Sequence, residues 1–255
     1  MKKLVISEFY KTIYSKKNKV LFILAMAMYA VLALFTLFYG QGFYDNNNII
    51  KINSLNFPAF LMREYHFIFI FVIILTLAVD SLSWEKISGI YRLYMIRAYT
   101  KKELIISKIV FISILALLVT MVIFILSTII GWLFAIKVNT TDFIHMNKQF
   151  NIIQSIVYNL KFFLCEWIIT LGIIGITSIV SVFSHNAIIT YLCSIGIAIG
   201  SIYVYDKLEF FFVSSKIIFD TLGGIDKSFL FIAPTLAIIT IVLSIVLFNI
   251  KDYKY

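Results

Sequence analysis

The sequence has 255 residues, of which 62% are hydrophobic and only 14% are charged. Several uncharged apolar stretches reach about 20 residues, the length that a helix needs to cross a bilayer. This composition excludes a soluble domain and predicts an all-α polytopic membrane protein, and the net charge of +9 fits lysines on the cytoplasmic side of a bilayer better than a nucleic-acid partner.

The first 19 residues form a basic segment that contains six lysines. Its apolar side chains recur with helical spacing at Ile6, Phe9, Tyr10 and Ile13. We therefore predict an N-terminal amphipathic interface helix over residues 1–19, lying on the cytoplasmic surface of the bilayer. A plain basic leader before the first span is the alternative interpretation.

Six apolar runs predict six transmembrane helices, with short polar or basic segments between them. We place these spans at Val20–Gly40, Tyr65–Trp84, Ile109–Ile136, Phe162–Phe183, Ala187–Tyr205 and Phe229–Ile250. The segment 206–228 is too apolar for an ordinary loop and too short to span, which favours outer re-entrant or interfacial helices. The predicted cytoplasmic segments hold 14 Lys and Arg residues and the outer segments hold 8, so both termini are expected in the cytoplasm.

The segment 84–103, between the second and third predicted spans, combines cations with an apolar stripe. Ile87, Ile90, Tyr91 and Tyr94 follow helical spacing. Thr100 and Glu103 match a capping box, which predicts that a helix starts at Thr100. The segment is either a positively charged loop that lies on anionic lipid or a structured cytosolic elbow that binds another protein.

This segment resembles the elbow of ABC-2 type transporter permeases. The matching positions are Glu85, Gly89, the apolar run 90–96, Thr100, Lys101, Glu103 and Lys108. The sequence departs from the family pattern at Ile90, where the family usually has Thr, and at Ala98, where it usually has Pro. The six-span layout and the N-terminal interface helix extend the resemblance over residues 1–255, as a single transmembrane permease domain.

The resemblance implies a coupling elbow that receives force from a separate cytosolic ABC ATPase. The implied ATPase-binding residues are Glu85, Gly89, Tyr91, Arg92, Tyr94, Arg97, Thr100, Lys101 and Glu103. ATP and magnesium would bind to that partner, because this chain contains no G-x-x-x-x-G-K-[ST] motif. It also lacks the H-E-x-x-H and G-x-S-x-G motifs, so we expect neither a cofactor, a metal nor an enzymatic activity in this chain.

Glu166 is the most unusual residue of the predicted spans, since an unpaired carboxylate in hydrocarbon is costly. The sequence places it about five residues inside the outer end of the fourth span. It either lines a substrate path or extends to the outer interface beside Trp167.

Gly196 and Gly200 form a G-x-x-x-G pair in the fifth span. Small residues four apart let helix backbones approach closely, which suits either internal packing or contact with a second subunit. The resemblance favours the second possibility, since ABC-2 permeases pair through their first and fifth spans.

These features predict the transmembrane subunit of an ATP-driven exporter in a bacterial cell membrane. Its partners would be the ATPase, a second permease subunit and the lipid bilayer. The aromatic, weakly polar spans and the family resemblance favour an amphipathic or hydrophobic substrate, such as a toxin or an antimicrobial peptide. The alternative is a non-transporting six-span sensor, scaffold or assembly protein.

Overall fold

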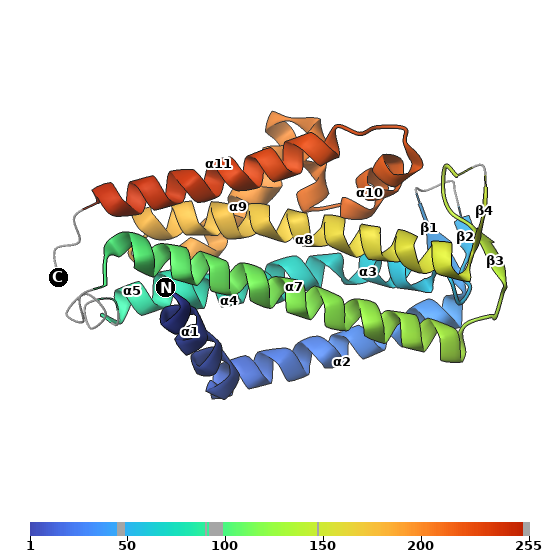
Figure 1. Ribbon diagram of the computed structural model, residues 1–255, viewed down its shortest axis with the longest axis horizontal. Helices are drawn as coiled ribbons and strands as arrows, with labels where there is room; N and C mark the ends of the chain where they lie inside the picture. Colours follow the sequence, from blue (N-terminus) through green and yellow to red (C-terminus); the bar gives the residue numbers. More distant parts are fainter. Residues whose placement is uncertain (45–48, 90, 92–98, 147, 252–255) are drawn as a thin grey trace.

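The computed structural model describes residues 1–44, 49–89, 91, 99–146 and 148–251. Within these residues, six helices are long and apolar enough to cross a membrane, which agrees with a polytopic helical protein. They run at Lys16–Tyr39, Phe57–Ile87, Lys101–Phe134, Ile152–Phe183, Ala187–Val204 and Phe229–Ile250. Figure 1 shows them as an elongated bundle, with helix α1 at one end and small β-hairpins at the other. We name these the α1 end and the hairpin end.

The N-terminal segment forms two helices rather than one helix of 19 residues. Helix α1, Lys2–Tyr14, ends at Ser15, and α2, Lys16–Tyr39, starts there, with the Ser15 hydroxyl accepting a hydrogen bond from the Asn18 amide. The predicted boundary at Lys19 is therefore wrong. Helix α1 turns Leu4, Glu8 and Thr12 into the protein, while most of the predicted apolar stripe faces outward, as expected of a helix that contacts lipid.

The second span is longer than the sequence indicated. It begins at Phe57 with α3, Phe57–Phe67, and continues through α4, Leu75–Val79, to α5, Glu85–Ile87. Wider π-helical turns at Ile68–Ile74 and Asp80–Trp84 join these pieces. The predicted start at Tyr65 is wrong, since the helix already begins at Phe57. Pro58 does not prevent this, because it lies in the first turn, where a missing amide proton costs no helical hydrogen bond.

The third and fourth spans are the longest helices of the bundle. Helix α7, Lys101–Phe134, starts at the predicted capping box, in which the Glu103 amide donates to Thr100 Oγ1 at 3.2 Å. Its 34 residues extend about 51 Å, well beyond a hydrocarbon core of about 30 Å. Helix α8, Ile152–Phe183, starts ten residues before the predicted Phe162, and Gln154 Oε1 accepts from the backbone amide of Asn151 at 3.1 Å.

Two antiparallel hairpins, which the sequence did not predict, lie at the hairpin end. Strand β1, Gln41–Phe43, pairs with β2, Ile49–Lys51, and β3, Thr140–Asp142, pairs with β4, Gln149–Asn151. Asn53 Nδ2 donates to Thr141 Oγ1 at 2.7 Å. This bond ties the two loops together, so the predicted outer loops are partly ordered sheets.

The last two spans enclose a short helical cap. Helix α9, Ala187–Val204, is followed by a 3₁₀ helix at Asp206–Phe211 and by α10, Ser214–Gly223. Short helices thus occur within 206–228, and their re-entrant or interfacial placement on the outer side stays a prediction. Helix α11, Phe229–Ile250, then returns along α8 to the α1 end. A side chain at Gly175 would overlap Thr240, so this close contact of α8 and α11 requires glycine.

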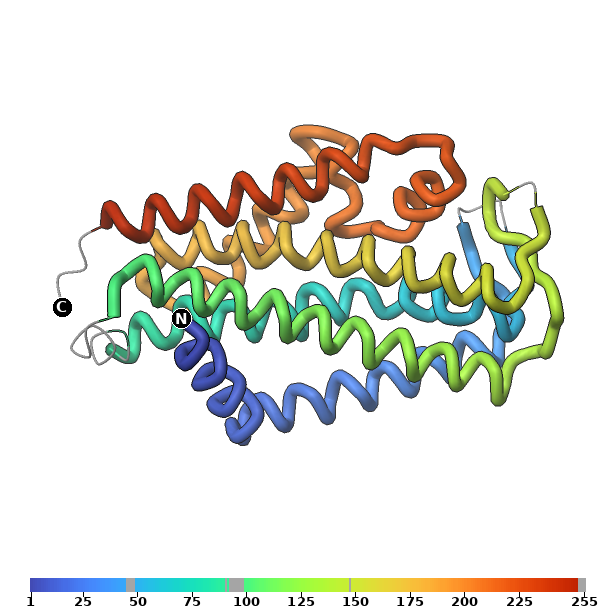
Figure 2. The backbone as a smooth tube through the Cα atoms, viewed as in Figure 1, coloured from blue at the N-terminus to red at the C-terminus, as the bar shows by residue number. Residues whose placement is uncertain are grey.

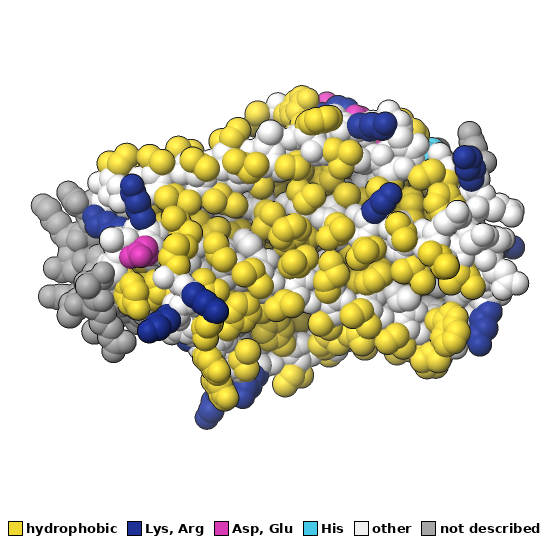
Figure 3. Space-filling view, in the orientation of Figure 1, with side chains coloured by type: hydrophobic (Ala, Val, Ile, Leu, Met, Phe, Trp, Pro, Cys, Tyr) yellow, Lys and Arg dark blue, Asp and Glu magenta, His cyan; other side chains and the backbone are white. Residues whose placement is uncertain are grey.

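The outer surface of the bundle is suited to a bilayer. Figure 3 shows hydrophobic side chains over the middle of one face, with Lys and Arg mainly toward the two ends. Helix α1 and the C-terminal end of α11 lie at the same end in Figure 2. This arrangement places both ends of the described chain on one side of a membrane that the bundle would cross.

Candidate functional site: two buried ionisable clusters

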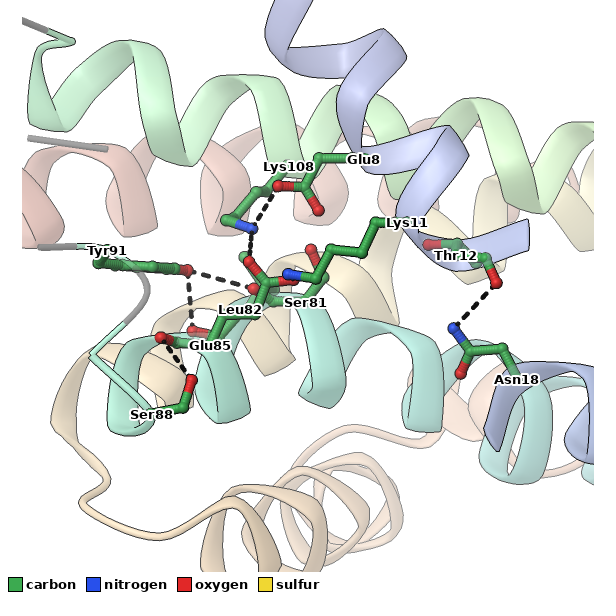
Figure 4. Close-up of polar contacts among 10 residues, drawn as sticks. All are labelled: Glu8, Lys11, Thr12, Asn18, Ser81, Leu82, Glu85, Ser88, Tyr91 and Lys108. Atoms are coloured by element: carbon green, nitrogen blue, oxygen red, sulfur yellow. Dashed lines mark hydrogen bonds and ion pairs between the residues drawn. The ribbon is translucent and has the colours of Figure 1, made fainter. Parts of the chain in front are cut away.

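Four charged side chains meet at the α1 end, and we name them the charged cluster: Glu8, Lys11, Glu85 and Lys108. Lys108 Nζ donates to Glu8 Oε1 at 2.7 Å and also contacts Glu85 Oε2. Lys11 pairs with the other oxygen of Glu85. Figure 4 shows Lys108 of α7 pointing between Glu8 of α1 and Glu85 of α5. The cluster therefore joins α1 to α5 and α7, and local spacing does not relate its members: Lys108 is 100 residues from Glu8 and 23 from Glu85.

The charged cluster is shielded from solvent except at Lys11. Lys108 is fully buried, and Glu8 and Glu85 are 3% and 4% exposed. Buried charges persist only when opposite charges and hydrogen bonds compensate their lost hydration. Burial raises the pKa of the Glu8 carboxyl, because its loss of water outweighs the attraction of Lys108, and the neighbouring Glu85 carboxylate raises it further.

Tyr91 belongs to the surroundings of this cluster and not to an exposed surface. Its ring is buried and lies 5.3 Å from Lys108 Nζ, and its hydroxyl donates to the Leu82 carbonyl at 3.0 Å. Glu85 is likewise buried. Both side chains attach the elbow to the bundle in this conformation, and their direct contact with an ATPase stays a prediction.

The other predicted ATPase-binding residues have different positions. Thr100 is exposed and Glu103 is half-buried, and together they cap α7. Lys101 donates to the carbonyl of Lys251 at 3.1 Å, next to the end of α11. Gly89 has a φ of +76°, a backbone conformation in which a side chain would be strained. Three further predicted residues lie outside the described residues: Arg92, Tyr94 and Arg97.

A second buried group, the histidine cluster, consists of His66, Glu166 and Ser214. His66 Nδ1 lies 2.8 Å from Glu166 Oε2, and Ser214 Oγ lies 2.9 Å from the same nitrogen. The Ser214 hydroxyl also contacts Glu166 Oε1. The cluster joins α3 and α8 to the start of α10, the second helix of the segment between α9 and α11.

The geometry of the histidine cluster requires a shared proton. His66 Nε2 lies 3.3 Å from the Phe211 carbonyl oxygen, which can only accept, so Nε2 carries a proton. Nδ1 and Glu166 Oε2 would repel one another as two bare acceptors, so one more proton lies between them. Because Ser214 approaches Nδ1 and not Nε2, these residues lack the arrangement in which a histidine activates a serine.

The Glu166 side chain points into the bundle toward His66 and does not extend along the surface beside Trp167. Glu166 is fully buried, and it lies 14 residues after the start of α8 and 17 before its end, so it is near the middle of the helix. Trp167 turns elsewhere and donates to the Ser113 carbonyl at 3.1 Å. A substrate-path role for Glu166 remains a prediction.

The sequence provided only part of the signal for the histidine cluster. Glu166 stood out as a carboxylate in an apolar run that needed a partner. His66 is 100 residues away and Ser214 is 48 residues away, so periodicity could not identify them. The placement of His66 near the outer end of the second span was the one available indication.

Gly196 and Gly200 do not pack against another helix of the same chain. A β-carbon at either position would have no atom within 4 Å, so the interpretation of internal packing is wrong. Their role in contact with a second subunit stays a prediction.

Comparisons with known proteins do not identify this chain: no family model matches it, and no curated protein matches it significantly.

Proposed function

We propose that this chain is the transmembrane subunit of an ATP-driven exporter of the ABC-2 type. The proposal combines the resemblance of the elbow with the arrangement of elements at the α1 end, which would face the cytoplasm. A separate ATPase would bind there and supply the energy of ATP hydrolysis. A second permease subunit would complete the transport path.

The observation that carries the proposal is the position of Lys108. An element that receives force can move the spans only if it is firmly attached to them. Lys108 of α7 binds Glu8 of the interface helix and Glu85 at the start of the elbow. A displacement of the elbow would therefore pull directly on α7, the helix that starts where the elbow ends.

A second attachment supports the same role. Lys86, next to Glu85, donates to the Ser184 carbonyl at 2.9 Å and contacts other carbonyls at the end of α8. A cation at the C-terminus of a helix satisfies free carbonyls and interacts favourably with the helix dipole. The elbow is thus attached to both α7 and α8.

The proposed substrate is amphipathic or hydrophobic, such as a toxin or an antimicrobial peptide. Support comes from apolar side chains that α2 and α9 leave exposed, including Leu34, Phe38, Ile188 and Leu192. These helices would line a path or an interface with the second subunit. The competing function is a six-span sensor or scaffold, which would need no ATPase.

Recovery of an ATPase with the purified permease tests the proposal. Thr100→Ala removes the cap of α7 at the elbow, and Gln154→Ala removes the side chain that caps the start of α8 at the hairpin end. Thr100→Ala destabilises its helix start by about 1 kcal/mol, and Gln154→Ala removes one capping-box hydrogen bond at the start of α8. We expect Thr100→Ala to reduce ATPase recovery about fivefold, whereas Gln154→Ala leaves it unchanged.

Two results would contradict the proposal. If no P-loop protein accompanies the wild-type chain from its native membrane, the sensor or scaffold function is favoured. If both variants lose the ATPase equally, recovery reports general stability and the elbow has no special role in binding.

The proposed orientation has its own test. After Cys165 and Cys193 are replaced by Ser, His185→Cys at the α1 end and Lys148→Cys at the hairpin end each provide one exposed thiol. In intact cells, an impermeant reagent should label only the second. Labelling of His185→Cys alone would reverse the orientation.

A further inference from the structure

The second span contains two π-helical turns, which we name the first wide turn, Ile68–Ile74, and the second wide turn, Asp80–Trp84. In such a turn an amide donates to the carbonyl five residues earlier instead of four, so the turn holds one residue more than an α-helical turn, and these turns are frequent at functional sites. The Leu75 amide donates to the Ile70 carbonyl in this way. The Phe71 carbonyl, its α-helical acceptor, is therefore open to another donor.

Each wide turn receives a tyrosine hydroxyl from a distant element. Tyr191 of α9 donates to the Phe71 carbonyl of the first wide turn at 2.8 Å. In the second wide turn, Tyr91 of the elbow donates to the Leu82 carbonyl at 3.0 Å and lies 3.3 Å from the Ser81 carbonyl, as Figure 4 shows. The elbow and α9 therefore each hold one wide turn through a single side chain.

The segment between the wide turns is the part of the second span that has room to shift. Helix α4 is only five residues long, and a groove of about 310 Å³ lies beside it, with Thr76 and Val79 in its wall. The pieces on either side of α4 are anchored, since His66 fixes α3 to the histidine cluster and Glu85 fixes α5 to the charged cluster. A change in either wide turn would therefore move α4.

We propose that the second span has alternative helix registers, and that Tyr91 and Tyr191 hold it in the register seen here. When one of them withdraws, its wide turn closes to an α-helical turn and the other wide turn takes up the extra residue. Helix α4 then shifts by one residue, which is a rotation of about 100° and a translation of about 1.5 Å. A movement of the elbow would thus rotate α4 through Tyr91.

The direction of the shift depends on the tyrosine that withdraws. With α5 fixed, closure of the second wide turn brings Leu77 to the position of Thr76 in the groove. With α3 fixed, closure of the first wide turn brings Leu75 there instead. Leu77 is now 4% exposed and Leu75 is fully buried, so either shift exposes a side chain that the present register hides.

Single thiols at these two positions can report the shift in the purified full chain. After Cys165 and Cys193 are replaced by Ser, Leu75→Cys and Leu77→Cys each provide one thiol for N-ethylmaleimide. The proposal does not rest on an ATPase, because substitution by Phe withdraws either tyrosine hydroxyl and keeps the ring in place.

Loss of one hydrogen bond changes a conformational equilibrium by about fivefold. Tyr91→Phe should therefore speed the labelling of Leu77→Cys about fivefold and leave that of Leu75→Cys unchanged. Tyr191→Phe should do the reverse. The control is Tyr65→Phe, since the Tyr65 hydroxyl donates to the Ala25 carbonyl of α2 at 3.0 Å, outside both wide turns. It should change neither rate.

Hydrogen exchange of chains that keep both leucines provides an independent measurement. Tyr91→Phe should speed the exchange of residues 80–87 about fivefold, and Tyr191→Phe that of residues 68–75. The proposal is overturned if both thiols are labelled faster in the same variant, because the span then unfolds locally without a change of register. It is also overturned if neither substitution changes labelling or exchange, or if Tyr65→Phe has the same effects.

Discussion

The charged cluster and the histidine cluster solve the same physical problem in different ways. Both hold carboxylates away from water. In the charged cluster, Lys108 and Lys11 balance Glu8 and Glu85 with full opposite charges. In the histidine cluster, Glu166 has no permanent cation beside it and depends on a proton shared with His66. The first cluster should therefore respond most strongly to the loss of a cation, and the second to the loss of a hydrogen-bond partner.

The largest effect is expected for Lys108→Met. This change leaves Glu8 and Glu85 buried beside one another without their common cation, and breaking a buried pair in this way costs about 3–5 kcal/mol. The free energy of unfolding in detergent should fall by that amount. Lys161→Met, at an exposed lysine of α8, should have almost no effect.

A compensating variant sharpens this prediction. Lys108→Met combined with Glu8→Gln and Glu85→Gln removes both uncompensated carboxylates, so much of the lost stability should return. If the triple variant is no more stable than Lys108→Met alone, packing of the lysine side chain and not its charge holds the three elements together.

His66→Leu should have the next largest effect. It removes the partner of Glu166 but keeps Ser214, so one carboxyl oxygen loses its buried hydrogen bond. We expect a loss of about 2 kcal/mol in the free energy of unfolding, and His185→Leu at an exposed histidine is the control. Equal losses for the two variants would argue against a buried role for His66.

Glu166→Gln should destabilise the protein less, by under about 1 kcal/mol. A low-dielectric site favours the neutral pair of imidazole and carboxylic acid over two separated charges. Glutamine imitates the neutral acid, since its amide can donate to His66 Nδ1 and its oxygen can accept from Ser214. The measurement is again unfolding in detergent, with Glu64→Gln on the surface as control.

If Glu166 also lines a substrate path, Glu166→Gln should reduce transport while this stability remains. Normal transport by the stable variant would assign the residue a structural role alone. A loss of 3 kcal/mol or more, by contrast, would indicate that the cluster holds an ion pair like that of the charged cluster.

The smallest effect concerns the exposed ion pair of Lys207 and Asp226, between α9 and α11, where water screens the charges. The Lys207 ammonium and the Ser228 amide lower the pKa of Asp226 to about 2. Because this folded-state pKa lies below that of the unfolded chain, the pair stabilises the protein at neutral pH and its contribution is lost as the pH falls toward about 2.

Asp226→Asn should therefore make stability slightly less sensitive to acid. The comparison is between the unfolding midpoints of wild type and variant at about pH 6 and about pH 2.5. A difference as large as that of His66→Leu would be inconsistent with a solvent-exposed pair.

The sequence by itself determined the features that depend on neighbouring residues. Apolar runs identified the spans, and the ends of α9 and α11 lie within one residue of their predicted positions. The start of α7 was predictable because Thr100 and Glu103 form their hydrogen bonds within one helical turn. Such signals are local, so composition and spacing contain them.

Only the tertiary structure decided the clusters and the extended helix starts. Lys108 lies 100 residues from Glu8, and Glu166 lies 100 residues from His66, so no local pattern relates them. The first turn of α8 contains Gln154 and Ser155, which resemble a loop, and Pro58 in the first turn of α3 resembles a turn. Asn159 of α8 donates to the carbonyl of Leu55, just before α3, at 2.8 Å, and this bond holds the two helix starts together. Tyr91 illustrates the same limit: its helical spacing indicated an apolar face, but only the tertiary structure shows that its ring packs inward against Phe248 and Lys108.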